Sequence, residues 1–162
     1  AAKTMNFLTE HGISSYGELE SKLTAISARR DTAHAEIKRI ESRSAELALV
    51  MKHAGTYRQL KPLYDRYRKS NDKEKFLRGH ESEIILFEAA ARELKRLGAV
   101  PLPTTESMKT ELANLNAEKE RLLAEYKTAR TEAQEYETVK QNVDALLAVP
   151  KDQEQQRRHE LE

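Results

Sequence analysis

The sequence contains no cysteine and no tryptophan, and its 162 residues include only five glycines and four prolines. Without cysteine, the chain has neither a disulfide framework nor a thiolate ligand for a metal or redox centre. No apolar run approaches the roughly 20 residues that span a bilayer, and the first residues lack the apolar segment of a signal peptide. We therefore predict a protein that does not insert into a membrane, and a cytoplasmic location fits these absences.

What the sequence does contain is typical of long helices. Charged residues make up 34% and hydrophobic residues 38% of the chain, and alanine, glutamate, lysine, leucine and arginine dominate. This balance favours thin helical seams over a thick globular core. The formal net charge is +1, so any electrostatic function depends on local clustering rather than on a global field. The Leu161-Glu162 ending is one that tagged expression vectors often leave, so we expect a piece of a longer protein.

A heptad pattern predicts a first long helix. Ser15 and Glu18 match a capping box at its start, and Gly55 is a residue type that closes helices. The helix is expected over residues 13–54, after a short helical segment within residues 1–12. Steps of four and three residues connect ten seam positions, eight of them apolar: Leu19, Leu23, Ile26, Arg30, Ala33, Ile37, Ile40, Ser44, Leu47 and Met51.

A second heptad pattern predicts a long helix over residues 104–149. Thr104 or Thr105 offers a cap at its start, and Pro150 is expected to end it, leaving a disordered tail over residues 150–162. At 1.5 Å rise per residue, the helix would be about 60 Å long. Ten of twelve seam positions can pack: Met108, Leu112, Leu115, Lys119, Leu122, Tyr126, Ala129, Ala133, Tyr136, Lys140, Val143 and Leu147.

The two heptad helices are expected to pair with each other. Sustained heptads need a partner seam, and one chain already contains two seams of similar length. The predicted fold is all-α: a long antiparallel two-helix coiled coil with a small helical insert, or head, at the end away from both termini. A monomer is favoured, with a dimer through the same seams as the alternative. Four seam positions are polar: Arg30, Ser44, Lys119 and Lys140. Their side chains either extend out of a thin seam into solvent or set the register of the pairing. The first interpretation is preferred.

The insert, residues 55–103, is predicted to contain three shorter helices. The first spans about residues 56–70, with Pro62 tolerable only near its first turn. The second is a short piece ending at Gly79, and the third runs over residues 81–97. Apolar side chains are densest in this region, which predicts a small core of its own; they include Tyr57, Leu60, Tyr64, Tyr67, Phe76, Ile84, Ile85, Leu86, Phe87, Ala90, Ala91 and Leu94.

The sequence offers no catalytic or metal-binding motif. Its five histidines never occur in an HxH or HExxH arrangement, and its glycines do not form a phosphate-binding loop. Six tyrosines are better explained by packing than by nucleophilic chemistry, because no metal ligands or cationic clamp accompany them. We therefore expect no enzyme activity, no cofactor and no metal in this part of the protein.

One stretch is strongly basic. Between Arg58 and Arg78, eight cations face three carboxylates, a local excess of five positive charges. Interleaved with Tyr64, Tyr67 and Phe76, these cations suit contact with phosphates and stacking on unpaired bases. A solvated face around buried aromatics is the competing interpretation. The candidate nucleic-acid contacts are Arg58, Lys61, Arg66, Arg68, Lys69, Lys73, Lys75 and Arg78.

Three stretches together carry a family resemblance. They are NFLTEHGISSYGELESKL, then TYRQLKPLYDRYRKSNDKEKFLRGHESEIILFEAAARELKRLG, then LPTTESMKTELANLNAEKERLLAEYKTARTEAQEYETVKQNVDALL. Nearly the whole chain resembles the C-terminal region of relaxases, the mobilisation nucleases of conjugative and integrative elements of Firmicutes. The block LKPLYDRYRKSNDKEKFLRGHESEI is its most distinctive part.

The resemblance implies a role in conjugative DNA transfer. Relaxases nick one strand at a transfer origin with a catalytic tyrosine and a histidine-bound metal, and both motifs lie in an N-terminal nuclease domain that this sequence lacks. No catalytic position is therefore carried over. The implied function is an accessory helical domain that binds DNA, conjugative transfer proteins or both. The alternative is a coiled-coil scaffold that binds protein partners only.

Overall fold

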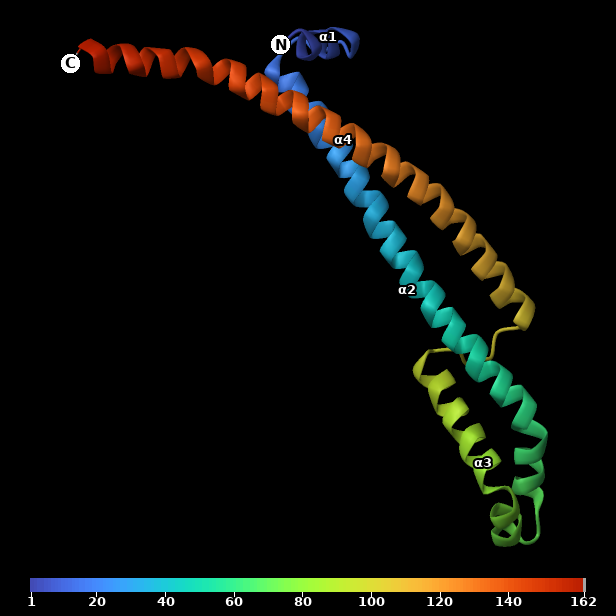
Figure 1. The fold of residues 1–162 in the computed structure, drawn as a ribbon. Helices are drawn as coiled ribbons and strands as arrows, with labels where there is room; N and C mark the ends of the chain where they lie inside the picture. The colour runs from blue at the N-terminus through green and yellow to red at the C-terminus, as the bar shows by residue number, and fades with distance from the viewer. Residues whose placement is uncertain (162) are drawn as a thin grey trace. The chain divides into compact units, whose positions relative to one another are not determined.

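The computed structural model describes the backbone of residues 1–161 and the side chains of residues 1–148 and of Leu161. This part of the chain is all-α, as predicted, and contains no strand. No helix within it is long and apolar enough to cross a membrane. Its four helices are α1 (Ala2–Glu10), α2 (Tyr16–Lys69), α3 (Lys73–Arg96) and α4 (Thr105–Leu161) (Figure 1).

The chain divides into two compact units, and α2 and α4 contribute to both. The terminal unit comprises Ala1–Ile37 and Glu120–Glu162, and the head unit comprises Lys38–Lys119. Each unit has its own buried side chains and its own contacts between helices, so each is described separately.

In the terminal unit, α2 and α4 pair antiparallel. The Tyr16 hydroxyl donates a hydrogen bond to Asp144 at 2.6 Å, and Arg29 forms an ion pair with Glu132 at 3.2 Å. Partner numbers fall along α4 as they rise along α2, which is the antiparallel order. The unit buries six core side chains, against which Phe7, Leu8, Leu23 and Val143 pack: Ile13, Leu19, Ile26, Ala133, Tyr136 and Val139.

The head unit repeats this antiparallel pairing. The Arg43 guanidinium donates two hydrogen bonds to the Glu111 carboxylate, at 2.7 and 3.1 Å. Arg39 of α2 forms an ion pair with Glu118 of α4 at 3.8 Å, and the order of these two pairs along the helices is again antiparallel. Ile40 and Leu47 of α2 are almost fully buried. The predicted pairing of the two heptad helices is therefore confirmed within each unit.

Most predicted seam positions are buried or half-buried, but one prediction is wrong. Leu147 is 59% exposed, because Tyr16 at the beginning of α2 already pairs with Asp144. Among the polar seam residues, Lys119 is half-buried and lies 3.7 Å from Glu41, across the seam. A long side chain that reaches the other helix at the edge of the seam fits the preferred interpretation of extended stems.

The predicted helix starts are confirmed. The Ser15 hydroxyl accepts a hydrogen bond from the Glu18 backbone N–H at 3.1 Å, and the Thr104 hydroxyl accepts one from the Ser107 N–H at 3.1 Å. These bonds satisfy backbone donors that a helix leaves without partners in its first turn. The Glu18 carboxylate accepts from the N–H of Ser14 rather than from that of Ser15. The capping box therefore closes one residue earlier than the sequence pattern predicts.

The predicted end of the first long helix at Gly55 is wrong, because α2 continues to Lys69 and includes Pro62. Gly55 does not adopt the left-handed backbone that closes a helix. Side chains on both sides of these residues hold α2 against α3: the rings of Tyr57 and Tyr64 both stack on Phe87. Packing of this kind outweighs the helix propensity lost at a single glycine or proline.

The remaining insert forms α3, in which two helical segments meet at a kink. His80 has a non-helical backbone there, with φ −137° and ψ 27°, so the predicted boundary after Gly79 is confirmed as a break between the two segments. The predicted stop at Gly98 is confirmed by a φ of 71°, a conformation that glycine adopts without strain. Ile85 and Leu86, expected in the core, are 54% and 55% exposed. The helical period turns them away from α2.

The predicted end of the second long helix at Pro150 is also wrong. The backbone of α4 is helical to Leu161. A proline removes one N–H donor and crowds the preceding turn, which weakens a helix without obliging it to end. Within the tail predicted over residues 150–162, Glu162 and the side chains of residues 150–160 lie outside the described residues.

Candidate nucleic-acid interface

The predicted basic residues gather where α2 ends and α3 begins. Figure 1 shows α3 lying beside the last part of α2, after a short turn. In that turn, the Asp72 side chain caps α3 by accepting the Lys75 backbone N–H at 3.1 Å. We call this region, residues 58–78, the tip. All eight predicted cations are exposed there: Arg58, Lys61, Arg66, Arg68, Lys69, Lys73, Lys75 and Arg78.

Three of the eight cations make contacts within the head unit. The Arg58 guanidinium donates to the Pro103 carbonyl at 2.5 Å and to the Thr105 hydroxyl at 2.9 Å. These bonds attach α2 to the start of α4, so Arg58 has a structural role. Lys61 forms an ion pair with Asp65 at 3.0 Å, which raises the pKa of the lysine. The Arg66 guanidinium lies over the Phe76 ring, 5.7 Å from its centroid, in a cation–π contact.

The other five cations carry the electrostatic case. Their charged groups form no hydrogen bond, ion pair or ring contact with any residue that the structure describes. Of the three carboxylates in the tip, Asp65 already pairs with Lys61, Asp72 is used as a helix cap, and Glu74 forms no ion pair with these five cations. The tip therefore presents positive charge to solvent that no internal carboxylate neutralises. These five are Arg68, Lys69, Lys73, Lys75 and Arg78.

Aromatic side chains in and beside the tip contact one another. Phe87, only 5% exposed, lies between Tyr57 and Tyr64, with ring centroids 4.8 and 4.3 Å away and planes within 27° of parallel. Ring contacts continue from Tyr64 to Tyr67 at 5.9 Å and from Tyr67 to Phe76 at 6.0 Å. Phe87 is buried, whereas the other four rings are half-buried. The faces of Tyr57 and Tyr64 that meet Phe87 are therefore not available to unpaired bases.

A groove runs beside the aromatic stack, between α2 and α3. Its volume is about 440 Å³, and it brings Arg68 of α2 and Arg92 of α3 to one surface. Arg92 was not among the predicted contacts, because it lies 14 residues beyond the basic stretch. Its spacing from buried Ile84 and Phe87 places it near the edge of the face that α3 turns to α2. This spacing is the sequence feature that could have identified Arg92 as a groove residue. The groove is lined by Tyr57, Lys61, Tyr64, Asp65, Arg68, Phe87, Glu88, Ala91 and Arg92.

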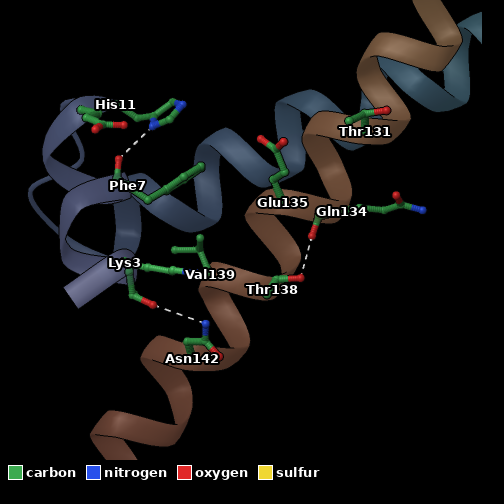
Figure 2. Close-up of a pocket in the computed structure, with 11 residues that line it drawn as sticks. Lys3, Phe7, His11, Thr131, Gln134, Glu135, Thr138, Val139 and Asn142 are labelled. Atoms are coloured by element: carbon green, nitrogen blue, oxygen red, sulfur yellow. Dashed lines mark hydrogen bonds between the residues drawn. The ribbon is translucent and has the colours of Figure 1, made fainter. Parts of the chain in front are cut away.

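A second groove lies in the terminal unit, between α1 and α4 (Figure 2). It has a volume of about 660 Å³. The Phe7 ring packs edge-on against Tyr136 at 5.0 Å, and the Asn142 amide donates to the buried Thr4 hydroxyl at 3.3 Å. His11 stacks on Phe7 and bonds its carbonyl at 2.8 Å. These contacts join α1 to α4, and they bring together no cluster of like charge.

The described residues form no cluster of three or more histidine, cysteine, aspartate or glutamate side chains suited to hold a metal ion. His34 lies near Tyr126 in the terminal unit, with ring centroids 5.7 Å apart. His80 lies against Phe76 in the head unit, with its ring nitrogen 3.6 Å from Glu83. Three of the described histidines, His11, His34 and His80, thus contact aromatic rings.

No family model matches the chain, and neither a curated protein nor a solved structure matches it. Membership of the relaxases therefore stays a prediction.

Proposed function

We propose that this chain is a non-catalytic helical module that binds DNA through the tip of its head. The observation that supports the proposal is the group of five exposed cations with no partner among the described residues. A cation held by a neighbouring carboxylate gains little from a phosphate, whereas an unpartnered one gains the full contact and releases counterions from the DNA.

The biological setting that we propose is conjugative mobilisation. In this proposal the chain is the accessory C-terminal domain of a relaxase whose nuclease domain cuts the DNA. The resemblance of the block LKPLYDRYRKSNDKEKFLRGHESEI to relaxases supports this setting, and that block forms most of the tip. Holding DNA near the nuclease is a task that needs charge but no catalytic group.

A salt titration tests DNA binding directly. Fluorescence anisotropy with a labelled duplex and a labelled single strand should show binding at 50 mM salt. If three to six tip cations contact phosphates, the slope of log K against log salt is about −3 to −5 on duplex DNA. The affinity should then fall about 60-fold to 1,000-fold between 50 and 200 mM salt. No detectable binding at 50 mM salt would reject the proposal.

A scaffold that binds only proteins is the second candidate. The observation that favours it is the pair Ile85 and Leu86, which expose apolar side chains on α3. Capture of transfer proteins from the parent element should survive nuclease treatment, and the double substitution I85S/L86S should abolish it. Such capture together with flat DNA titrations would establish the scaffold in place of the DNA-binding module.

A further inference from the structure

We infer that the groove between α2 and α3 binds a nucleic-acid strand by its sugar-phosphate backbone, with Arg92 as a phosphate contact. This inference rests on the proposed DNA binding and names a site and a mode of contact for it. The groove lies next to the tip and shares Lys61 and Arg68 with it.

Cations line both walls of the groove. Arg68 comes from α2 and Arg92 from α3, and neither guanidinium forms a hydrogen bond or ion pair with another described residue. One helical turn beyond Arg92, Arg96 is held by Glu93 at 2.7 Å. A planar guanidinium without a carboxylate can donate two parallel hydrogen bonds to a phosphate.

The charge around the groove favours an extended anion. Lys61 is paired with Asp65 at 3.0 Å, so the groove cations without an ion pair to a described residue are Arg68 and Arg92. The unpartnered cations of the tip, among them Lys69 next to Arg68, continue the positive charge outside the groove. One strand can contact the groove and the tip at once, so the site suits a polyanion rather than a small phosphate ligand.

The aromatic wall indicates which part of the strand enters the groove. The rings of Tyr57, Phe87 and Tyr64 are stacked face to face, with centroid spacings of 4.8 and 4.3 Å. The faces of Tyr57 and Tyr64 that meet Phe87 are occupied, which leaves fewer ring faces on which bases can stack. The two arginines, rather than the rings, are therefore the groups that hold the strand.

Two carboxylates line the groove; Asp65 is paired with Lys61, and Glu88 opposes binding and provides a test of opposite sign. Glu88 lines the same groove and repels phosphates placed between the two arginines. Removing its charge should strengthen binding, whereas removing the charge of Arg92 should weaken it. No general loss of folding can produce both changes.

The test uses anisotropy titrations of the whole chain with a single-stranded oligonucleotide at 50 mM salt. We expect R92Q to weaken binding about fivefold and E88Q to strengthen it about twofold to fivefold, as one charge contact in water implies. R96Q, which removes a paired arginine outside the groove, should change affinity less than twofold. An abasic strand of the same length should bind as tightly as the normal strand.

The outcomes separate this inference from the proposed function. Replacing the unpartnered cations of the tip, such as Arg68, Lys69 and Lys73, by glutamine provides the comparison. If that variant loses DNA binding while R92Q and E88Q leave binding unchanged, the strand avoids the groove and only this inference fails. A loss of about fivefold or more with the abasic strand would overturn backbone contact, because each stacked base contributes on this scale. If the unaltered chain does not bind DNA, the proposed function and the groove fail together.

Discussion

The paired helices and the tip contain the same types of charged residue but use them differently. Along α2 and α4, arginines meet carboxylates across the seam: Arg29 lies 3.2 Å from Glu132 and Arg43 lies 2.7 Å from Glu111. At the tip, five cations have no such partner among the described residues. Basic composition alone therefore does not indicate a binding site. What distinguishes the tip is positive charge without an internal partner.

The two regions also differ in what they bury. The seam of the terminal unit contains small residues, with Ala129 and Ala133 each 3% exposed, so two helices can approach closely. The head buries a stack of aromatic rings around Phe87 instead. Small residues suit a pair of parallel or antiparallel helices, whereas large rings fill the wider space where a short helix packs on a long one.

The largest effect is expected at the centre of the aromatic stack. Phe87→Ala removes the ring that both Tyr57 and Tyr64 contact, so it should lower the free energy of unfolding by about 3–5 kcal/mol. Ile85→Ala on the same helix is the control, because Ile85 is 54% exposed and should cost far less. Urea unfolding followed by circular dichroism measures both. Equal losses would show that the stack is not the core of the head.

A smaller effect is expected in the seam. Ala133→Leu inserts a large side chain where the seam is closely packed, so it should destabilise the chain by about 1–3 kcal/mol. Ala124→Leu makes the same chemical change at an exposed position of α4 and should alter stability by less than about 0.5 kcal/mol. Thermal unfolding compares the two variants. If Ala133→Leu leaves the stability of the chain unchanged, close packing of α2 and α4 in the terminal unit would be contradicted.

The ion pair of the head unit should contribute less still. Arg43 hydrogen-bonds Glu111 and thereby lowers the pKa of that carboxyl below 4.5. A carboxyl whose pKa is lowered by folding stabilises the folded state at pH values above its unfolded-state pKa. This stability is lost as the pH falls through its folded-state pKa. The side chains are 38% and 41% exposed, so Glu111→Gln should cost at most about 1 kcal/mol at pH 7 and nothing well below the folded pKa. Unfolding at pH 7 and pH 3 checks this, and an equal cost at both would exclude the pair as the cause.

The smallest effect concerns one exposed hydrogen bond in the terminal unit. The hydrogen bond to Asp144 raises the pKa of Tyr16 from 10.0 to about 12. A tyrosine whose pKa is raised by folding stabilises the folded state at pH values below its unfolded-state pKa. This stability is lost as the pH rises toward the folded-state pKa, here between pH 10 and about 12. An ultraviolet titration that follows phenolate formation should show one tyrosine ionising near pH 12. Tyr16→Phe should remove that ionisation, and Asp144→Asn should move it toward pH 10. An unchanged titration curve in both variants would argue against the bond.

Heptad spacing predicted the paired helices well, because a seam with a period of 3.5 residues requires a partner. Local signals failed where tertiary packing outweighs them: Gly55 and Pro62 look like helix stops, yet α2 passes through both beside Phe87. The basic stretch was visible in the sequence. Whether each cation is free or paired was not, because partners such as Pro103 and Thr105 for Arg58 come from distant parts of the chain.

A charge-matched comparison tests the central claim most directly. The tip variant R68Q/K69Q/K73Q and the seam variant R29Q/R39Q/R43Q each remove three positive charges from the chain. At 50 mM salt, we expect the tip variant to bind DNA about a hundredfold more weakly, as three lost phosphate contacts imply, while the seam variant stays within about threefold of the unaltered chain. Equal losses in the two variants would contradict the claim, because binding would then depend on total charge rather than on the unpartnered cations of the tip.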